Sequence, residues 1–130
     1  MPGLALIIAL LLHFDPVGHY WVSQYPVRVE SPIIRDGVQY HGWGNWIPDY
    51  IAIDLPGIGD MTWGIGDRIA IAMCILPHEA MHVRKQSAHE ELPLLAEYVC
   101  LDRAGASWGL KDAVYGQLKA AVIPPFRPEE

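Results

Sequence analysis

The feature that most constrains this chain is a long apolar segment with helical spacing, residues 68–86, which reads RIAIAMCILPHEAMHVRKQ. Apolar side chains recur along it at steps of three and four residues, the repeat of one helix face: Ile69, Met73, Leu76, Ala80 and Val83. Its first half is apolar on every side, because Ile71, Ala72 and Ile75 fill the other faces. A helix that is apolar all round is buried, so we predict that it forms the centre of the fold.

Pro77 lies in the middle of this segment and allows two interpretations. A proline inside a helix removes one backbone hydrogen bond and bends the helix, here near Met73. Alternatively, residues 69–76 form a buried strand, and Pro77 opens a shorter helix at a position where proline is tolerated. We favour one kinked helix because the apolar spacing continues through the proline. We expect Asp67 to cap its start.

The rest of the chain predicts short strands before the central helix and further helices after it. Strand-forming residues fill 20–30, 38–46 and 49–54, with a turn signal at Asp36-Gly37. Residues 55–67 read as a glycine-rich loop. The spacing of Ser87 and Glu90 is that of a capping box for a helix that ends before Gly105, and residues 110–123 predict a last helix. This order indicates an α+β domain with a small, mostly antiparallel sheet.

Length and composition fit one domain that spans residues 1–130. The chain is 52% hydrophobic and 18% charged, which is enough apolar surface for a core, and only the last residues, IPPFRPEE, read as disordered. The net charge is -6 without any basic run, so we expect no nucleic-acid partner. The apolar stretch within residues 1–14 has three interpretations: a buried first element, an export signal, or a membrane anchor through residues 4–14. The localisation depends on which one holds.

The segment His78-Glu79-Ala80-Met81-His82 carries the chemistry. Residues i and i+4 of a helix project from one face, so both imidazoles can reach one zinc ion. Glu79 points to the side of that pair, where its carboxylate can take a proton from a water molecule. We therefore predict His78 and His82 as metal ligands and Glu79 as the catalytic base.

A catalytic zinc site needs a third protein ligand. Glu90 and Glu91 follow closely, but Glu90 is better explained as the acid of the capping box. Glu97 is the better candidate, since it falls in an apolar stripe with Leu94 and Leu101. A carboxylate that faces a core is costly unless it is paired or binds a metal. The predicted metal ligands are therefore His78, His82 and Glu97.

These motifs resemble the gluzincin type of zinc metallopeptidase, in which a helix with HExxH is completed by a glutamate on the next helix. The resemblance rests on LPHEAMH and ELPLLAEY and covers about residues 69–105. It implies a minimal zincin-like domain that hydrolyses peptide bonds of a peptide or protein substrate with zinc-activated water. It also implies that an edge strand lines the cleft, for which we expect residues 49–54. Many members carry an acid four residues after the ligand glutamate, but here Leu101 stands there and Asp102 follows it.

The alternative is a non-catalytic domain in which zinc only joins helices. Cys74 allows it, because Cys74, His78 and His82 are spaced four residues apart on one helix. The sequence leaves the oligomeric state and the substrate open. If the two ligand helices run antiparallel, Cys74 and Cys100 lie at similar positions along the axes of the paired helices. We predict that they are neighbours, as free thiols in a reducing compartment or as a disulfide in an oxidising one.

Overall fold

The structure is a computed structural model that describes residues 1–122. The tail that we predicted to be disordered, residues 123–130, lies outside the described residues. The fold is α+β, as predicted, and its elements follow the chain in this order: α1 (Leu4–Phe14), α2 (Pro16–Val22), β1 (Val27–Val29), β2 (Ile33–Arg35), β3 (Val38–Tyr40), β4 (Gly42–Asn45), β5 (Tyr50–Ile53), α3 (Leu55–Gly59), α4 (Ile65–Lys85), α5 (Glu91–Arg103) and α6 (Trp108–Val122).

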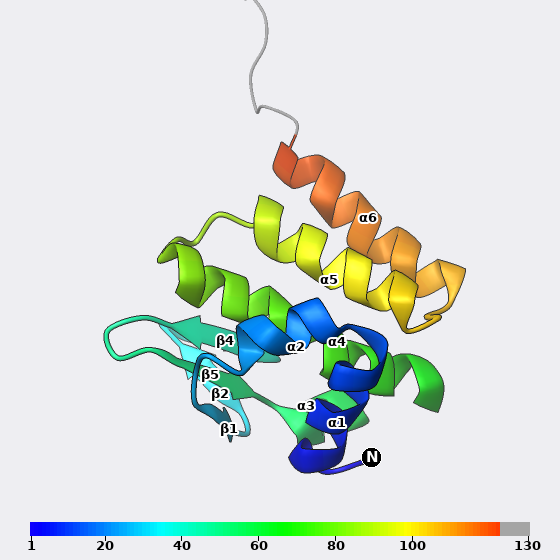
Figure 1. The fold of residues 1–130 in the computed structure, drawn as a ribbon, viewed down its shortest axis with the longest axis horizontal. Helices are drawn as coiled ribbons and strands as arrows, with labels where there is room; N and C mark the ends of the chain where they lie inside the picture. Colours follow the sequence, from blue (N-terminus) through cyan, green and yellow to red (C-terminus); the bar gives the residue numbers. More distant parts are fainter. Residues whose placement is uncertain (123–130) are drawn as a thin grey trace, which may run out of the picture.

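The central helix, α4, is continuous through Pro77, so the helical interpretation is confirmed and the strand alternative is wrong. Figure 1 shows α4 in the middle of the molecule, with α5 and α6 on one side and the strands on the other. Pro77 is fully buried. A Cβ atom on Gly18 of α2 would lie 3.0 Å from the Pro77 ring, so glycine lets α2 pack closely against the proline.

The start of α4 differs from the prediction. The helix begins at Ile65 with Gly64 as its N-cap, and Asp67 lies in the first turn. The Asp67 carboxylate accepts hydrogen bonds from the backbone N–H of Ser107, at 3.0 Å, and from its hydroxyl. Asp67 is therefore not the cap, because its side chain instead ties the start of α4 to the residue that precedes α6.

The N-terminal apolar segment forms α1, and its residues Ile7 and Leu11 are fully buried in the core. Among the described residues, no helix combines the length and apolarity that crossing a bilayer requires. Residues 20–22 belong to α2, so the strand predicted over residues 20–30 is wrong for its first part. Within that range only β1 forms a strand. The reason is local: Pro16 suits a first helical position, and Asp15 accepts the N–H of Gly18 at 3.2 Å.

The main sheet has the strand order β1-β5-β4, in which β1 and β5 are parallel and β4 and β5 are antiparallel. It is therefore mixed rather than mostly antiparallel. Strands β2 and β3 form a separate hairpin whose turn is at Asp36-Gly37, as predicted; both residues have positive φ. The prediction that residues 49–54 form the edge is wrong, because β5 is central and β4 is an edge strand. Ile51, Ala52 and Ile53 are all fully buried, which is typical of a strand covered on both faces.

The predicted glycine-rich loop contains a short helix, α3. The Asp54 carboxylate caps it by accepting the N–H of Gly57 at 2.9 Å, and Pro56 occupies its first turn. Turn-forming residues at positions 54–57 therefore start a helix here rather than a loop.

Helices α4 and α5 run antiparallel, because residues further along α4 meet residues earlier on α5. Cys74 is bonded to Cys100 with a Cα–Cα distance of 5.5 Å, and four residues further on His78 meets Glu97. The predicted neighbourhood of the two cysteines is confirmed, and the structure contains the disulfide form.

Candidate metal and hydrolytic site

Helix α4 places the two histidines of the HExxH segment on one face. The ring centroids of His78 and His82 are 5.1 Å apart. Candidate ligand atoms of His78, Glu79 and His82 all lie within 4.8 Å of one another. The structure therefore brings together the three residues that the motif predicted.

Each imidazole is held at its Nδ1 atom. The Nδ1 of His78 lies 2.7 Å from Oε1 of Glu97, and the Nδ1 of His82 lies 2.8 Å from the backbone carbonyl oxygen of Ser87. A carbonyl oxygen only accepts, so the Nδ1 of His82 must donate. When the ring is protonated, Nε2 carries a proton as well; when the ring is neutral, Nε2 carries the lone pair that a metal would bind. Holding Nδ1 in this way fixes the tautomer and the orientation of metal-binding histidines.

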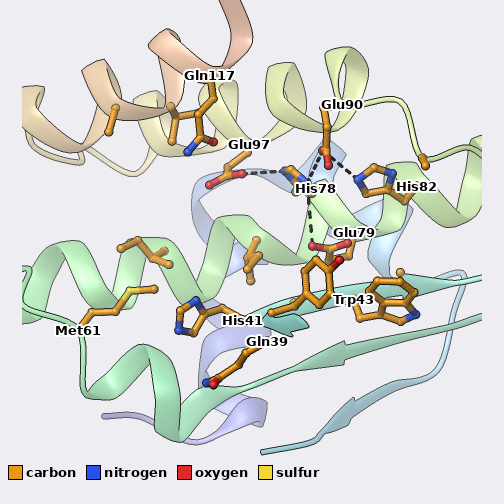
Figure 2. A pocket seen from close by; sticks show the side chains of 18 of the residues that line it. Gln39, His41, Trp43, Met61, His78, Glu79, His82, Glu90, Glu97 and Gln117 are labelled. Carbon is orange, nitrogen blue, oxygen red and sulfur yellow. Dashed lines mark hydrogen bonds and ion pairs between the residues drawn. The ribbon is translucent and has the colours of Figure 1, made fainter. Parts of the chain in front are cut away.

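The two Nε2 atoms face a common carboxylate, that of Glu90. Its Oε1 atom lies 3.1 Å from Nε2 of His78 and 3.0 Å from Nε2 of His82. Figure 2 shows Glu90 above the two rings and Glu79 below His78. Oε2 of Glu79 is 3.9 Å from Nε2 of His78. Two rings and two carboxylates thus converge at one place.

The capping box that we predicted for Ser87 and Glu90 is wrong. Helix α5 begins at Glu91, and the Glu90 side chain makes no capping hydrogen bond. The Ser87 hydroxyl accepts the N–H of His89. The physical reason is the pair of nearby imidazoles, which attract the Glu90 carboxylate more strongly than a backbone N–H does.

The charged groups of this cluster shift one another's pKa values. Hydrogen bonds from His78 and His82 lower the pKa of Glu90 to about 2. Burial alone would lower the pKa of His78, but hydrogen bonds to Glu90 and Glu97 outweigh it and raise that pKa to about 10. The pKa of His82 is raised in the same way, against its burial, by Glu90 and the Ser87 carbonyl.

Glu79 differs from the other carboxylates because it is almost completely buried. Burial raises its pKa, and the neighbouring His78 and His82 only partly offset this effect. A carboxylate with a raised pKa holds a proton more readily near neutral pH. Glu79 therefore has the environment that a proton-accepting base requires.

Strand β4 reaches this cluster through two glycines. A Cβ atom on Gly42 would lie 2.9 Å from Oε2 of Glu79 and 2.8 Å from the end of Ile75, and a Cβ on Gly44 would meet the Glu79 backbone. These two glycines therefore let the edge strand lie directly on α4.

The cluster lies in a cavity of about 740 Å³ between α4, α6 and β4. Figure 2 shows His41, Trp43 and Met61 along one side and Gln117 of α6 across from them. The apolar side chains in its wall are Trp43, Trp46, Met61, Trp63, Ile71, Ile75, Leu110 and Val114. The site thus opens into a space with a large apolar wall.

Two further residues of α5, Tyr98 and Asp102, contact residues of α6. The ring of Tyr98 packs against Tyr115, with centroids 5.9 Å apart. The carboxylate of Asp102 accepts a hydrogen bond from Lys111. Cys74 is bonded to Cys100, so it supplies no thiolate to the structural zinc site of the alternative hypothesis.

Sequence reasoning missed two residues of this region. Glu90 was assigned to the capping box, although its position a short loop after the two histidines of α4 was a usable signal. His41 had no assigned role, yet it lines the cavity. Its position follows from β4 lying on α4, which no local pattern indicated.

A scan of protein-family models, a search of curated proteins and a search of solved structures found no match to this chain. The likeness to gluzincins therefore stays a prediction from the motif.

Proposed function

We propose that this chain is a zinc-dependent hydrolase, and specifically a small peptidase. The observation that carries the proposal is the arrangement of His78 and His82. Both Nδ1 atoms are engaged by acceptors, and both Nε2 atoms point to one place beside a buried glutamate, Glu79. Nitrogen donors together with a carboxylate form a set that suits zinc.

His78 and His82 would hold the metal, with a carboxylate as the third protein ligand. When bound, zinc would lower the pKa of a water molecule and polarise a carbonyl group. Glu79 would accept a proton from the attacking water and pass it to the leaving amine. Its raised pKa supports both steps, because the group must take up a proton and later release it.

The cavity supports a peptide as the substrate. Gly42, Trp43 and Gly44 of edge strand β4 line it, and an extended peptide pairs with the free edge of such a strand through main-chain hydrogen bonds. The apolar wall formed by residues such as Met61 and Ile71 offers space for an apolar side chain.

The decisive experiment compares the zinc-loaded protein with the Glu79→Gln variant. Both would be incubated with a mixture of unmodified peptides, and cleavage would be followed by mass spectrometry. We expect Glu79→Gln to keep its zinc and fold but to lose at least about 100-fold in rate, the usual scale for a lost general base. Glu91→Gln, an exposed glutamate at the start of α5, is the matched control. Equal cleavage by wild type and Glu79→Gln would reject the mechanism.

A further inference from the structure

Two glutamates lie against His78, but they contact different nitrogen atoms. Glu97 contacts Nδ1 at 2.7 Å, whereas Glu90 contacts Nε2 at 3.1 Å. Only Glu90 also contacts His82, again at Nε2. We infer that Glu90 is the third protein ligand of the metal and that Glu97 is a positioning residue that orients His78. This inference rests on the proposed zinc site.

The distances among the donor atoms favour Glu90. Four donors around zinc, with bonds of ~2.0–2.1 Å, lie ~3.3–3.4 Å from one another in a tetrahedron. Oε1 of Glu90 is 3.1 Å and 3.0 Å from the two Nε2 atoms. Both of these distances are therefore within a few tenths of an ångström of the spacing between two zinc ligands.

Glu97 is engaged on the other nitrogen of the ring. The two lone-pair directions of an imidazole point away from each other, so an acceptor on Nδ1 lies away from a metal on Nε2. If Glu97 moved to the metal, Nδ1 of His78 would lose its hydrogen-bond partner. The His78 side chain is only 12% exposed, and a buried donor that is left unpaired destabilises the folded state.

The loop between α4 and α5 explains how Glu90 reaches the site. Gln86 ends α4 in the left-handed conformation, with φ of 48°, and turns the chain back. The Ser87 carbonyl then accepts the Nδ1 proton of His82, and Glu90 meets both Nε2 atoms. One short loop thus supplies a ligand and the group that orients another ligand.

Glutamine separates the two roles, because its amide oxygen accepts a hydrogen bond but is a poor zinc ligand. We would measure Zn²⁺ affinity by competition with a chromophoric chelator and record the visible absorption of the Co²⁺ form. Glu90→Gln should lower the affinity by about 100-fold or more and change the Co²⁺ spectrum. Glu97→Gln should lose less than about 10-fold, and Glu97→Leu about 10- to 100-fold, as for groups that orient metal ligands. Both Glu97 variants should keep the shape of the Co²⁺ spectrum.

The outcomes distinguish this inference from the proposed function. Glu91→Gln is the control, and far-ultraviolet circular dichroism would verify that each variant is folded. If Glu97→Gln lost affinity and changed the spectrum while Glu90→Gln did not, Glu97 would be the ligand and this inference would fail alone. Retained affinity in both glutamine variants would also overturn it. A wild-type chain that bound neither Zn²⁺ nor Co²⁺ would overturn the proposed function as well.

Discussion

A Cβ atom on Gly44 would overlap the backbone carbonyl oxygen of Glu79. Real atoms do not approach this closely, and a helix carbonyl cannot swing aside as a side chain can. Only glycine fits at residue 44, because the edge strand β4 crosses α4 there, at the position of the proposed base. The contact determines how closely β4 approaches α4 at Glu79.

The first prediction concerns this contact. Gly44→Ala should reduce the free energy of unfolding by about 1–3 kcal/mol, the range for overpacked sites, because β4 must move away from α4. Gly116→Ala is the matched control: Gly116 lies in α6, and an added Cβ there meets nothing within 4 Å. It should stabilise the protein by roughly 0.5–1 kcal/mol. Urea denaturation measures both free energies of unfolding. Equal values for the two variants would show that β4 and α4 are not in close contact at residue 44.

The second prediction concerns metal removal. The proposed zinc ion would bind the folded chain more tightly than the unfolded one, so free zinc at 100 times its dissociation constant should add about 2.7 kcal/mol to the stability of chelator-treated protein. The double variant His78→Ala/His82→Ala should not respond to zinc. His89→Ala, which removes an exposed histidine from the loop between α4 and α5, should respond like wild type. The measurement is thermal unfolding with and without zinc, and an undiminished response of the double variant would place the metal elsewhere.

The third prediction concerns the disulfide between α4 and α5. It joins residues 26 positions apart, and a loop of that length corresponds to about 3.5 kcal/mol of stabilisation through the unfolded state. Denaturation of the same wild-type protein with and without a reductant should show a difference of this size. The Cys74→Ala/Cys100→Ala variant should give identical curves under both conditions. A wild-type curve that did not change on complete reduction would contradict the prediction.

The fourth prediction concerns pH and the pair Glu30–Arg35. The guanidinium donates to both carboxylate oxygens, at 2.8 and 3.1 Å, and this hydrogen bonding lowers the pKa of Glu30 below its ordinary value of 4.5. A lowered folded-state pKa stabilises the fold above the unfolded-state value, and the contribution is lost as the pH falls through the folded-state value. The pair lies near the surface, so we expect a coupling of only about 0.5–1 kcal/mol at pH 7.

A double-mutant cycle with Glu30→Gln and Arg35→Met measures that coupling at several pH values. It should be constant from pH 7 to about pH 5 and decline below about pH 4.5, where the unfolded state begins to bind the proton. The cycle removes the separate contribution of the contact between Arg35 and the Tyr50 hydroxyl. A coupling that grew on acidification would contradict the assigned sign.

The sequence predicted those parts of the fold that depend on the spacing of residues along a helix. The spacing of apolar residues identified α4 despite Pro77. The positions of the two cysteines along antiparallel helices predicted their contact. The order of the strands was not predictable in this way, because β1 pairs with β5 across the intervening hairpin and β4. Residues 20–22 were misassigned because the cap at Asp15 outweighed the strand propensity of their side chains.

The arrangement of the candidate metal site was predictable within one helix and less so where it depends on a loop. His78, Glu79 and His82 follow from the spacing within α4. Glu90 matched a capping box in the sequence, but two imidazoles from another element compete for its carboxylate in the fold. Local patterns do not include such tertiary competitors, so the sequence alone could not decide between the two roles.

The antiparallel pairing of α4 and α5 also determines how this part of the molecule unfolds locally. Cys74, His78 and His82 follow at intervals of four residues along α4, and each is joined to α5 or the residues just before it: Cys74 to Cys100, His78 to Glu97 and His82 to Glu90. Three connections of different chemistry thus span two turns of one helix interface. Neither helix can unwind there without disturbing the other, so the backbone amides of both should exchange with deuterium as one cooperative unit. The residues that hold the proposed metal would then lie in one of the slowest-exchanging parts of the domain.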